Sequence, residues 1–360
     1  MTDSHASSAT SYPIVESDSR VSGAELLARV EAIFARCGML PEDARLLADS
    51  LVTADARGVH SHGVLRVPDY VRKLLRDGVD PRGRPRVIRE FGAIALLDAC
   101  NSMGQIACAA AMKDAVGRAD RFGIGAVAVR GSNHCGALFY TATQALRSGM
   151  IGLVTTNALP TMAPWGGRDK ILGINPIAVA IPSGDEPPII FDAAFSVSSH
   201  GKIRVYHQKG LRLPEGWALD ASGRPTTDAA AAIGGLLQPI GAFKGAGLAV
   251  ISGVLSSFLS GAAFGTELGD MVKGPTAGQD GHFVLAIQVS AFEDFDRFTG
   301  RVDGLVRQLR KCTPAAGFER CYAPGELEYE TELGYRAAGI PLSSETLAGL
   351  TECERTLECA

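Results

Sequence analysis

Apolar residues recur at helical spacing near the start of the chain. Between residues 22 and 37, leucine, valine, isoleucine and phenylalanine return every three or four positions, which predicts an amphipathic helix. Ser22 and Glu25 have the spacing of a capping box at its start. Gly38 follows as a typical stop signal, so we expect the helix to end there.

Two more helices are expected before residue 80. Pro41 suits the first turn of a helix that continues to Gly58. Residues 64–76 also have helical spacing, and because proline lacks a backbone N–H, we expect a bend at Pro68. The N-terminal part of the chain is therefore predicted to be helical.

The middle of the chain follows a different pattern. Short apolar runs bounded by turn residues predict buried strands at residues 94–97, 126–129, 151–154, 177–181, 189–191 and 282–289. Helices are expected at residues 105–121, 137–147 and 292–311. Strands that alternate with helices indicate a layered α/β domain.

These patterns divide the chain into three parts. Residues 1–20 are polar and lack the apolar segment of a secretion signal, so we expect a disordered tail on a cytoplasmic protein. Residues 21–88 and 291–345 are predicted to form one helical lobe. Residues 89–290 are predicted to form a mixed α/β domain.

Charge and composition narrow the class of protein. The net charge is −4 and no basic block is present, which makes nucleic acid an unlikely partner. The eight cysteines have no zinc-site spacing, so we expect reduced thiols and no metal. Residues 245–266 carry no charge and are long enough to cross a bilayer, but their serines and glycines favour a helix buried on all sides. Membrane attachment is the alternative.

Common catalytic and nucleotide-binding patterns are absent from the sequence. It contains no GxGxxG loop, no phosphate-binding GxxxxGK[ST] loop, no GxSxG and no HExxH. Any dinucleotide would therefore have to bind to a scaffold other than the usual one.

Two segments place histidines where they could transfer protons. The first runs from Arg57 to Arg66 and holds His62 in a glycine-flanked turn, four residues before an arginine that suits a carboxylate. The second places His134 between a predicted strand and a helix N-terminus, which is a natural anion site. The alternative for both segments is an ordinary turn, with the Cys135 thiol packed beneath it.

Two further segments could contact a ligand. Asp192 lies at a strand end, where it could bond a ribose hydroxyl or orient a donor. Lys244 lies in a glycine-rich loop before the uncharged segment, where a pyrophosphate could bind. A structural turn is the alternative for each.

Read in order, these segments resemble the type-2 malate/L-lactate dehydrogenase family, also called sulfolactate dehydrogenase-like. The resemblance covers about residues 20–330, and its local motifs are most similar to the ureidoglycolate dehydrogenase branch. The matching segments are residues 54–63, 132–136, 173–178, 201–203, 213–218, 223–228 and 244–245.

The resemblance implies a fold and a cofactor. It implies a non-Rossmann α/β fold in which the mixed-sheet domain, residues 89–290, binds NAD or NADP beside a helical N- and C-terminal lobe. It also implies a homodimer or a dimer of dimers. The reaction would transfer hydride at C2 of a small 2-hydroxy or 2-oxo acid of the malate, lactate or ureidoglycolate class.

The resemblance also implies residue roles. The catalytic group would be His134 or His62, with Ser61. The substrate would contact Arg66, Tyr70, Asn157 and Ile174. The cofactor would contact His134, Cys135, Gly136, Ala137, Leu138, Asp192, Ala193, Ala194, Lys244, Gly245, Tyr322, Pro324 and Gly325.

Three positions depart from the pattern of the family. Lys202 stands where the ketimine-reducing branch carries an acid, which disfavours that branch. Ile174 replaces a usual threonine, and Cys135 replaces a common aromatic residue. Two alternative functions remain. One is a cyclic ketimine reductase, which Lys202 disfavours, and the other is a catalytically degenerate ligand-binding member, which Ile174 leaves open.

Overall fold

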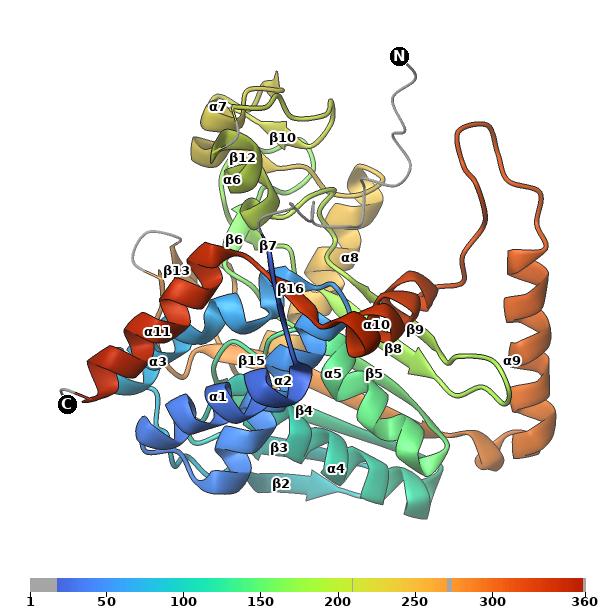
Figure 1. The fold of residues 1–360 in the computed structure, drawn as a ribbon. Helices are drawn as coiled ribbons and strands as arrows, with labels where there is room; N and C mark the ends of the chain where they lie inside the picture. The colour runs from blue at the N-terminus through green and yellow to red at the C-terminus, as the bar shows by residue number, and fades with distance from the viewer. Residues whose placement is uncertain (1–17, 209, 271–273, 359–360) are drawn as a thin grey trace.

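A central sheet organises the chain in the computed structural model, which describes residues 18–208, 210–270 and 274–358 (Figure 1). In order across the sheet, its seven strands are β2 (Arg86–Phe91), β3 (Ile94–Asp98), β4 (Ile124–Ser132), β15 (Asp280–Gln288), β5 (Met150–Thr156), β8 (Ile177–Ile181) and β9 (Ile189–Ala193). Strands β3 and β4 run parallel, and the other neighbours pair antiparallel. The predicted strands and the mixed α/β class are therefore confirmed.

Alanine-rich helices cover one face of the sheet. They are α4 (Gly104–Phe122) and α5 (Leu138–Ala142), and α5 continues into a 3-10 turn at Thr143–Ser148. Their small side chains form one core with the apolar residues of the strands. The predicted helix at residues 105–121 is confirmed, while the one at 137–147 is helical in two short pieces.

A helical cluster forms a second core. Its helices are α1 (Gly23–Arg36), α2 (Pro41–Ala56), α3 (Val67–Leu75) and α11 (Ser344–Glu358). The short strands β1 (Ser19–Val21) and β16 (Ile340–Leu342) pair beside it. The predicted tail therefore ends before Ser19, and residues 1–17 lie outside the described part of the chain.

Two predicted details of the helices are wrong. Ser22 precedes α1 but its side chain makes no capping hydrogen bond. Pro68 does not bend a helix, because the preceding residues form a separate 3-10 turn at Val64–Arg66 and the proline lies in the first turn of α3. Pro41 does begin α2, as predicted.

A small body stands above the sheet in Figure 1 and has its own core. It contains β6 (Pro160–Met162), β7 (Leu172–Gly173), α6 (His200–Gln208), β10 (Ala218–Leu219), β11 (Pro225–Thr226), α7 (Ala229–Gly234) and β12 (Leu236–Leu237). The remaining short strands are β13 (Gly269–Asp270) and β14 (Gly274–Pro275).

The uncharged segment differs from its prediction. It forms α8 (Phe243–Gly253) and a π-helical turn at Val254–Phe258. The expectation of burial on all sides is wrong, because Leu248, Ile251 and Phe258 are 46%, 59% and 61% exposed. Across residues 18–208, 210–270 and 274–358, no helix has the length and apolar character needed to span a membrane.

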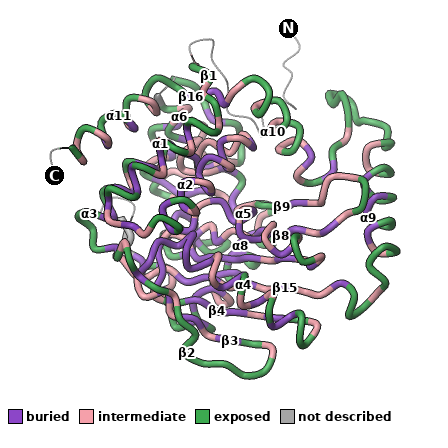
Figure 2. The backbone as a smooth tube through the Cα atoms, turned by 60° about the horizontal axis from the view of Figure 1, so that its bottom comes forward, coloured by how far each residue is buried: buried purple, intermediate pink, exposed green. Residues whose placement is uncertain are grey.

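Two C-terminal helices complete the fold. They are α9 (Phe295–Arg310), whose outer side is largely exposed, and α10 (Glu326–Ala338) (Figure 2). The helix predicted at residues 292–311 is therefore confirmed. The division of the chain into the three predicted parts stays a prediction.

Candidate active site

A buried carboxylate fixes the first histidine turn. His60–His62 form a 3-10 turn that follows α2. Asp55, near the end of α2, is 1% exposed and its Oδ1 lies 2.7 Å from His60 Nδ1. Its Oδ2 accepts a hydrogen bond of 2.7 Å from Val64 N–H. A side chain at position 63 would collide with this carboxylate, because an added Cβ would lie 2.1 Å from Asp55 Oδ1, so only Gly63 fits there.

The turn brings two imidazoles together. The rings of His62 and His134 stack with centroids 5.8 Å apart. Ser61 Oγ lies 2.9 Å from His62 Nδ1. The Tyr70 hydroxyl lies 2.7 Å from His134 Nδ1, and Gln105 donates to the Tyr70 oxygen at 3.0 Å. Since Nδ1 of His134 faces the Tyr70 oxygen, Nε2 is the ring atom left to face a substrate, and it accepts a proton in the tautomer whose Nδ1–H donates to Tyr70.

Both histidines are neutral at neutral pH. Burial, together with the charge of Arg66, lowers the pKa of His62 to about 4. Burial holds the pKa of His134 well below its usual range. The neighbouring side chains of His62, Arg66 and Lys73 lower it further. A neutral imidazole in this position can accept a proton from an alcohol.

Arg66 stands beside the histidine pair. Its Nε donates to the Ser61 carbonyl at 2.8 Å, and its Nη1 lies 3.4 Å from Asp69 Oδ2. The side chain keeps 35% of its surface exposed. It therefore presents a cation next to the histidine pair, and its predicted role in carboxylate binding stays a prediction.

The edge strand β9 gathers the predicted cofactor segments. Asp192 on β9 accepts a hydrogen bond of 2.8 Å from Phe139 N–H at the start of α5, which holds the Cys135–Leu138 segment in place. The side chain of Asp192 is exposed, yet the protein around it raises its pKa to about 6. The carboxyl group is therefore closely surrounded by protein although part of the residue reaches the surface.

Two more predicted segments reach the same strand. Ile240 N–H donates to the Phe195 carbonyl at 3.0 Å, which places the loop before Lys244 and Gly245 beside Ala193 and Ala194. Ile190 N–H donates to the Pro324 carbonyl at 3.0 Å, which brings in residues 322–325. Lys244 is exposed, and Tyr322 is 45% exposed. The structure thus brings these residues together from four parts of the chain.

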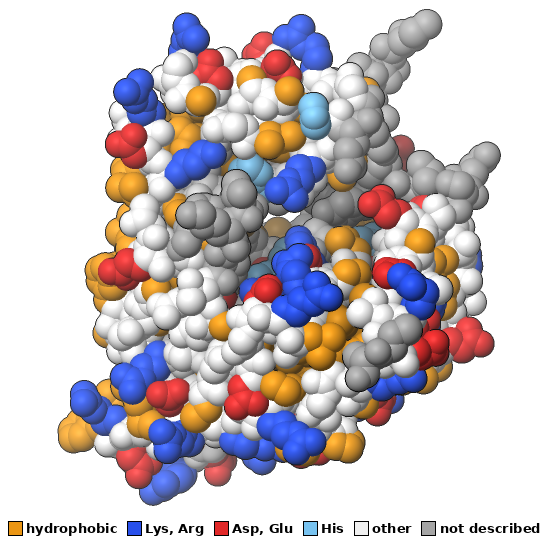
Figure 3. Space-filling view, turned by 90° about the vertical axis from the view of Figure 1, so that its left-hand side faces the viewer, with side chains coloured by type: hydrophobic (Ala, Val, Ile, Leu, Met, Phe, Trp, Pro, Cys, Tyr) orange, Lys and Arg blue, Asp and Glu red, His pale blue; other side chains and the backbone are white. Residues whose placement is uncertain are grey.

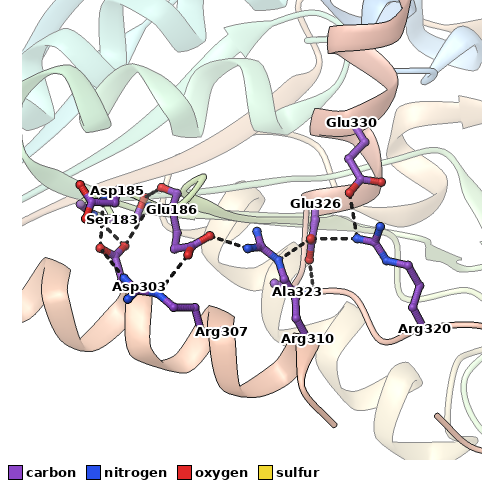
Figure 4. A network of polar contacts seen from close by, with 11 residues as sticks. Ser183, Asp185, Glu186, Asp303, Arg307, Arg310, Arg320, Ala323, Glu326 and Glu330 are labelled. Carbon is purple, nitrogen blue, oxygen red and sulfur yellow. Dashed lines mark hydrogen bonds and ion pairs between the residues drawn. The ribbon is translucent and has the colours of Figure 1, made fainter. Parts of the chain in front are cut away.

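A chain of ion pairs supports residues 322–325 (Figure 4). Glu326 is 5% exposed and accepts hydrogen bonds from Arg310, Arg320 and the backbone of Ala323. Arg310 also bonds Glu186 in the turn between β8 and β9. A cavity of about 430 Å³ adjoins this network, and its lining does not include the histidines. We therefore assign it a supporting position and not the reaction centre.

Two predicted substrate residues have internal roles in this conformation. Asn157 donates to Ser257 Oγ and the Ala263 carbonyl, and its Oδ1 accepts from Gly281 N–H. It therefore braces β5 against the segment that follows α8. Ile174 packs against the core of the small body, and its carbonyl accepts a bond from Phe195 N–H.

The molecular surface is hollowed on the face shown in Figure 3, where histidine side chains are visible beside and within the hollow. The reasoning from sequence missed Asp55, which fixes the histidine turn through His60 and Val64, and Gln105, which bonds the Tyr70 hydroxyl beside His134. Each is a polar residue on the buried face of a predicted helix, and that position was the available signal.

Comparison with known proteins identifies relatives of this chain. The malate/L-lactate dehydrogenase family matches residues 21–351. A malate dehydrogenase from Pyrococcus abyssi is 37% identical over 346 residues, covering 93% of this chain and 94% of that protein. A Delta(1)-pyrroline-2-carboxylate/Delta(1)-piperideine-2-carboxylate reductase from Pseudomonas putida is 34% identical, covering 95% and 99%. The NAD(+) ureidoglycolate dehydrogenase of Escherichia coli O157:H7 is 33% identical, covering 82% and 85%.

The fold is also similar to a solved structure. The sulfolactate dehydrogenase from Methanocaldococcus jannaschii superimposes with a TM-score of 0.88 and 33% identity, covering 94% of this chain and 98% of that one. The match extends over nearly the whole of both chains, so the predicted non-Rossmann fold is confirmed.

Proposed function

The chain belongs to the malate/L-lactate dehydrogenase family, and from that premise we propose that it is an NAD- or NADP-dependent oxidoreductase acting on a small 2-hydroxy or 2-oxo acid. One observation carries the proposal: Arg66 stands beside the neutral pair His62 and His134, with Nε2 of His134 available to a substrate. A cation for a carboxylate and a proton-transfer group for a hydroxyl are what such an acid requires.

The donor set around β9 fits a dinucleotide. The Asp192 carboxylate suits ribose hydroxyls, and the exposed Lys244 amine suits phosphate. Residues 135–138, Gly245 and residues 322–325 would form the rest of that site. When bound, the nicotinamide supplies or accepts the hydride.

The residues of this chain would then perform three tasks. Arg66 binds the substrate carboxylate and fixes the orientation of C2. His134 exchanges the hydroxyl proton at Nε2, while Tyr70 and Gln105 hold its ring. The negative charge of the bound acid offsets the Arg66 charge, which raises the pKa of His134 in the complex toward the range that proton donation needs. His62 is the second candidate for the proton-transfer role.

The test follows the near-ultraviolet absorbance of NADH and NADPH with the purified protein and pyruvate, oxaloacetate or oxalurate. Loss of signal with one acid and one cofactor, abolished in His134→Ala or His62→Ala while cofactor still binds, supports the proposal. Normal turnover in both variants contradicts the assignment of the proton-transfer group.

Cyclic ketimine reduction is the second candidate, favoured by the similarity to the Pseudomonas putida reductase. Against it, Lys202 is a cation and lies with its amine 5.2 Å from the Trp217 ring centroid in the small body. Activity on a cyclic imino acid, without activity on any 2-oxo acid, would establish ketimine reduction as the function. If the protein shows neither activity and does not bind the cofactor, the catalytically degenerate ligand-binding alternative is supported.

We also propose that the protein is a homodimer or a dimer of dimers. The apolar residues Leu248, Ile251 and Phe258 lie exposed along α8 and the turn that follows it, and a second copy of the chain could cover them.

A further inference from the structure

Two cysteines and a histidine meet next to the His134 turn. Cys108 lies on α4, Cys135 follows His134, and His282 lies on β15. Their sulfur and nitrogen atoms all lie within 4.8 Å of one another. They are 0%, 5% and 0% exposed, respectively. The proposed reaction gives no role to Cys108 or His282.

The contacts distinguish the two thiols. The neighbouring Cys108 thiol, and after it His282 and Thr156, hold the pKa of Cys135 well below its usual range, although burial opposes this. Burial raises the pKa of Cys108 well above its usual range. Burial alone would lower the pKa of His282, but the charges of Cys135 and Asp280 raise it on balance. These neighbours favour ionisation at Cys135 over Cys108, and the thiolate is the reactive form of cysteine.

A metal ion is a less suitable occupant of this group. Thiolates and imidazole would suit zinc. However, both nitrogens of His282 already have hydroxyl partners, Thr156 Oγ1 at 2.8 Å and Ser132 Oγ at 2.7 Å. Among the described residues the group contains three ligands, whereas a closed zinc site has four.

We propose that Cys135 and Cys108 form a peroxide-sensitive thiol pair that closes reversibly to a disulfide. The Cys135 sulfur attacks one oxygen of a hydroperoxide, the O–O bond breaks, and the leaving oxygen departs as hydroxide or alkoxide, which gives a sulfenic acid. The Cys108 sulfur then attacks the Cys135 sulfur, the S–O bond breaks, and the Cys108 proton leaves with the oxygen as water. The two sulfurs are oxidised by two electrons and the peroxide is reduced.

Closure of the pair would strain the catalytic turn. A disulfide needs a sulfur–sulfur distance of about 2.05 Å, so two sulfurs that lie within 4.8 Å of each other must be drawn together, which pulls on the turn that carries Cys135. The turn has little room to follow, because α4 packs so closely on it that a Cβ added at Gly104 would lie 2.0 Å from the Asn133 carbonyl oxygen. His134 lies between Asn133, which α4 holds in place, and Cys135, which the disulfide would pull. Oxidation is therefore expected to disturb the bond between His134 and Tyr70 and to lower turnover.

The experiment treats the purified full-length protein with hydrogen peroxide and maps its peptides without reduction. We expect a peptide linked between positions 108 and 135, the loss of both thiols from titration, and a fall in activity of tenfold or more, on the order expected when a proton-transfer group is displaced. Dithiothreitol should restore both thiols and activity. The mapping needs no turnover, so it tests this proposal independently of the proposed function.

Variants control for other thiols. Cys312→Ser with Cys321→Ser removes a pair in the loop after α9 and should leave the 108–135 link unchanged. Cys108→Ala should give no link, and its Cys135 should oxidise irreversibly; if Cys108→Ala unfolds, Cys108→Ser tests the same point. Absence of the linked peptide in the folded wild type overturns the proposal. Stoichiometric zinc in the purified protein that protects both thiols overturns it in favour of a metal site.

Discussion

At the scale of single residues, the protonation state of His134 sets the pH range of the reaction. A base must be unprotonated, so alcohol oxidation is lost as the pH falls through the pKa of the base. Because the pKa of His134 is held well below its usual range, kcat/KM for oxidation should stay level as pH falls from 8 to about 6.5, the ordinary histidine value. Initial rates of oxidation measured across this pH range test the expectation.

The reverse direction gives the matching check. Reduction needs the protonated ring, so kcat/KM for the 2-oxo acid should already decrease with rising pH near neutrality, by about tenfold per pH unit. An oxidation profile with its midpoint at pH 7 or above would contradict the lowered pKa.

Arg66 allows a second test at this scale. Arg66→Lys keeps the charge but loses the planar fork, so KM for the acid should rise by roughly 10- to 100-fold, the equivalent of a charge-assisted hydrogen bond. Cofactor affinity should change little. Arg72→Lys, six positions after Arg66 on α3 and with 56% of its side chain exposed, is the matched control. Equal losses for acid and cofactor would show that Arg66 is structural.

The sequence predicts the groups that do chemistry better than those that orient them. His62 and His134 stand next to glycines at turns, and Arg66 follows at short spacing, so local pattern predicts a site. Gln105 lies 35 positions from Tyr70 and bonds it through packing between helices. No local pattern encodes that contact, because it depends on how α3 and α4 meet.

At the scale of elements, the ion pairs between α9 and α10 support the cofactor segment. Glu326→Gln removes the charge that Arg310 and Arg320 share and weakens the bond to Ala323 N–H. Cofactor Kd should therefore rise by about 5- to 30-fold, the equivalent of roughly 1–2 kcal/mol, while KM for the acid stays within about twofold at saturating cofactor. Fluorescence titration with NADH or NADPH measures the first effect.

A control separates this effect from general loss of stability. Glu330→Gln removes a charge that bonds the same Arg320 but is itself half exposed, so its effect should be small. If Glu326→Gln and wild type bind the cofactor equally, the network has no part in holding residues 322–325.

The elements also show where sequence patterns fail. Buried strands are predicted well because each apolar run is short and bounded by turns. The Ser22 capping box fails because its geometry depends on a rotamer that the spacing does not determine. Pro68 lies in the first turn of a helix because the bonding of the Arg57–Arg66 turn ends just before it, and that turn depends on the Asp55 carboxylate nine positions before Val64.

At the scale of the whole molecule, α8 presents apolar side chains to the surroundings. Ile251→Asp would place a charge among Leu248, Phe258 and Leu259, and burying it in an interface is costly. If a second copy covers this face, the variant should have a smaller mass in light scattering than wild type, with its circular dichroism unchanged. Phe292→Asp, on the distant loop before α9 and 78% exposed, is the control. Equal masses for wild type, Ile251→Asp and Phe292→Asp would rule out the α8 interface.

The convergence of three chain segments on β9 and the residues just after it has a consequence for the order of folding. The Ile190–Pro324 bond joins residues 134 positions apart, and the Phe139–Asp192 bond joins residues 53 positions apart. Contacts between such distant positions close large loops, and the entropy of closing them must be lost before the contacts stabilise anything. The proposed dinucleotide site should therefore be one of the last features to mature during refolding, after the sheet has acquired its native circular dichroism. A nascent chain released before residue 320 would carry the histidines but lack the segment that completes this proposed site.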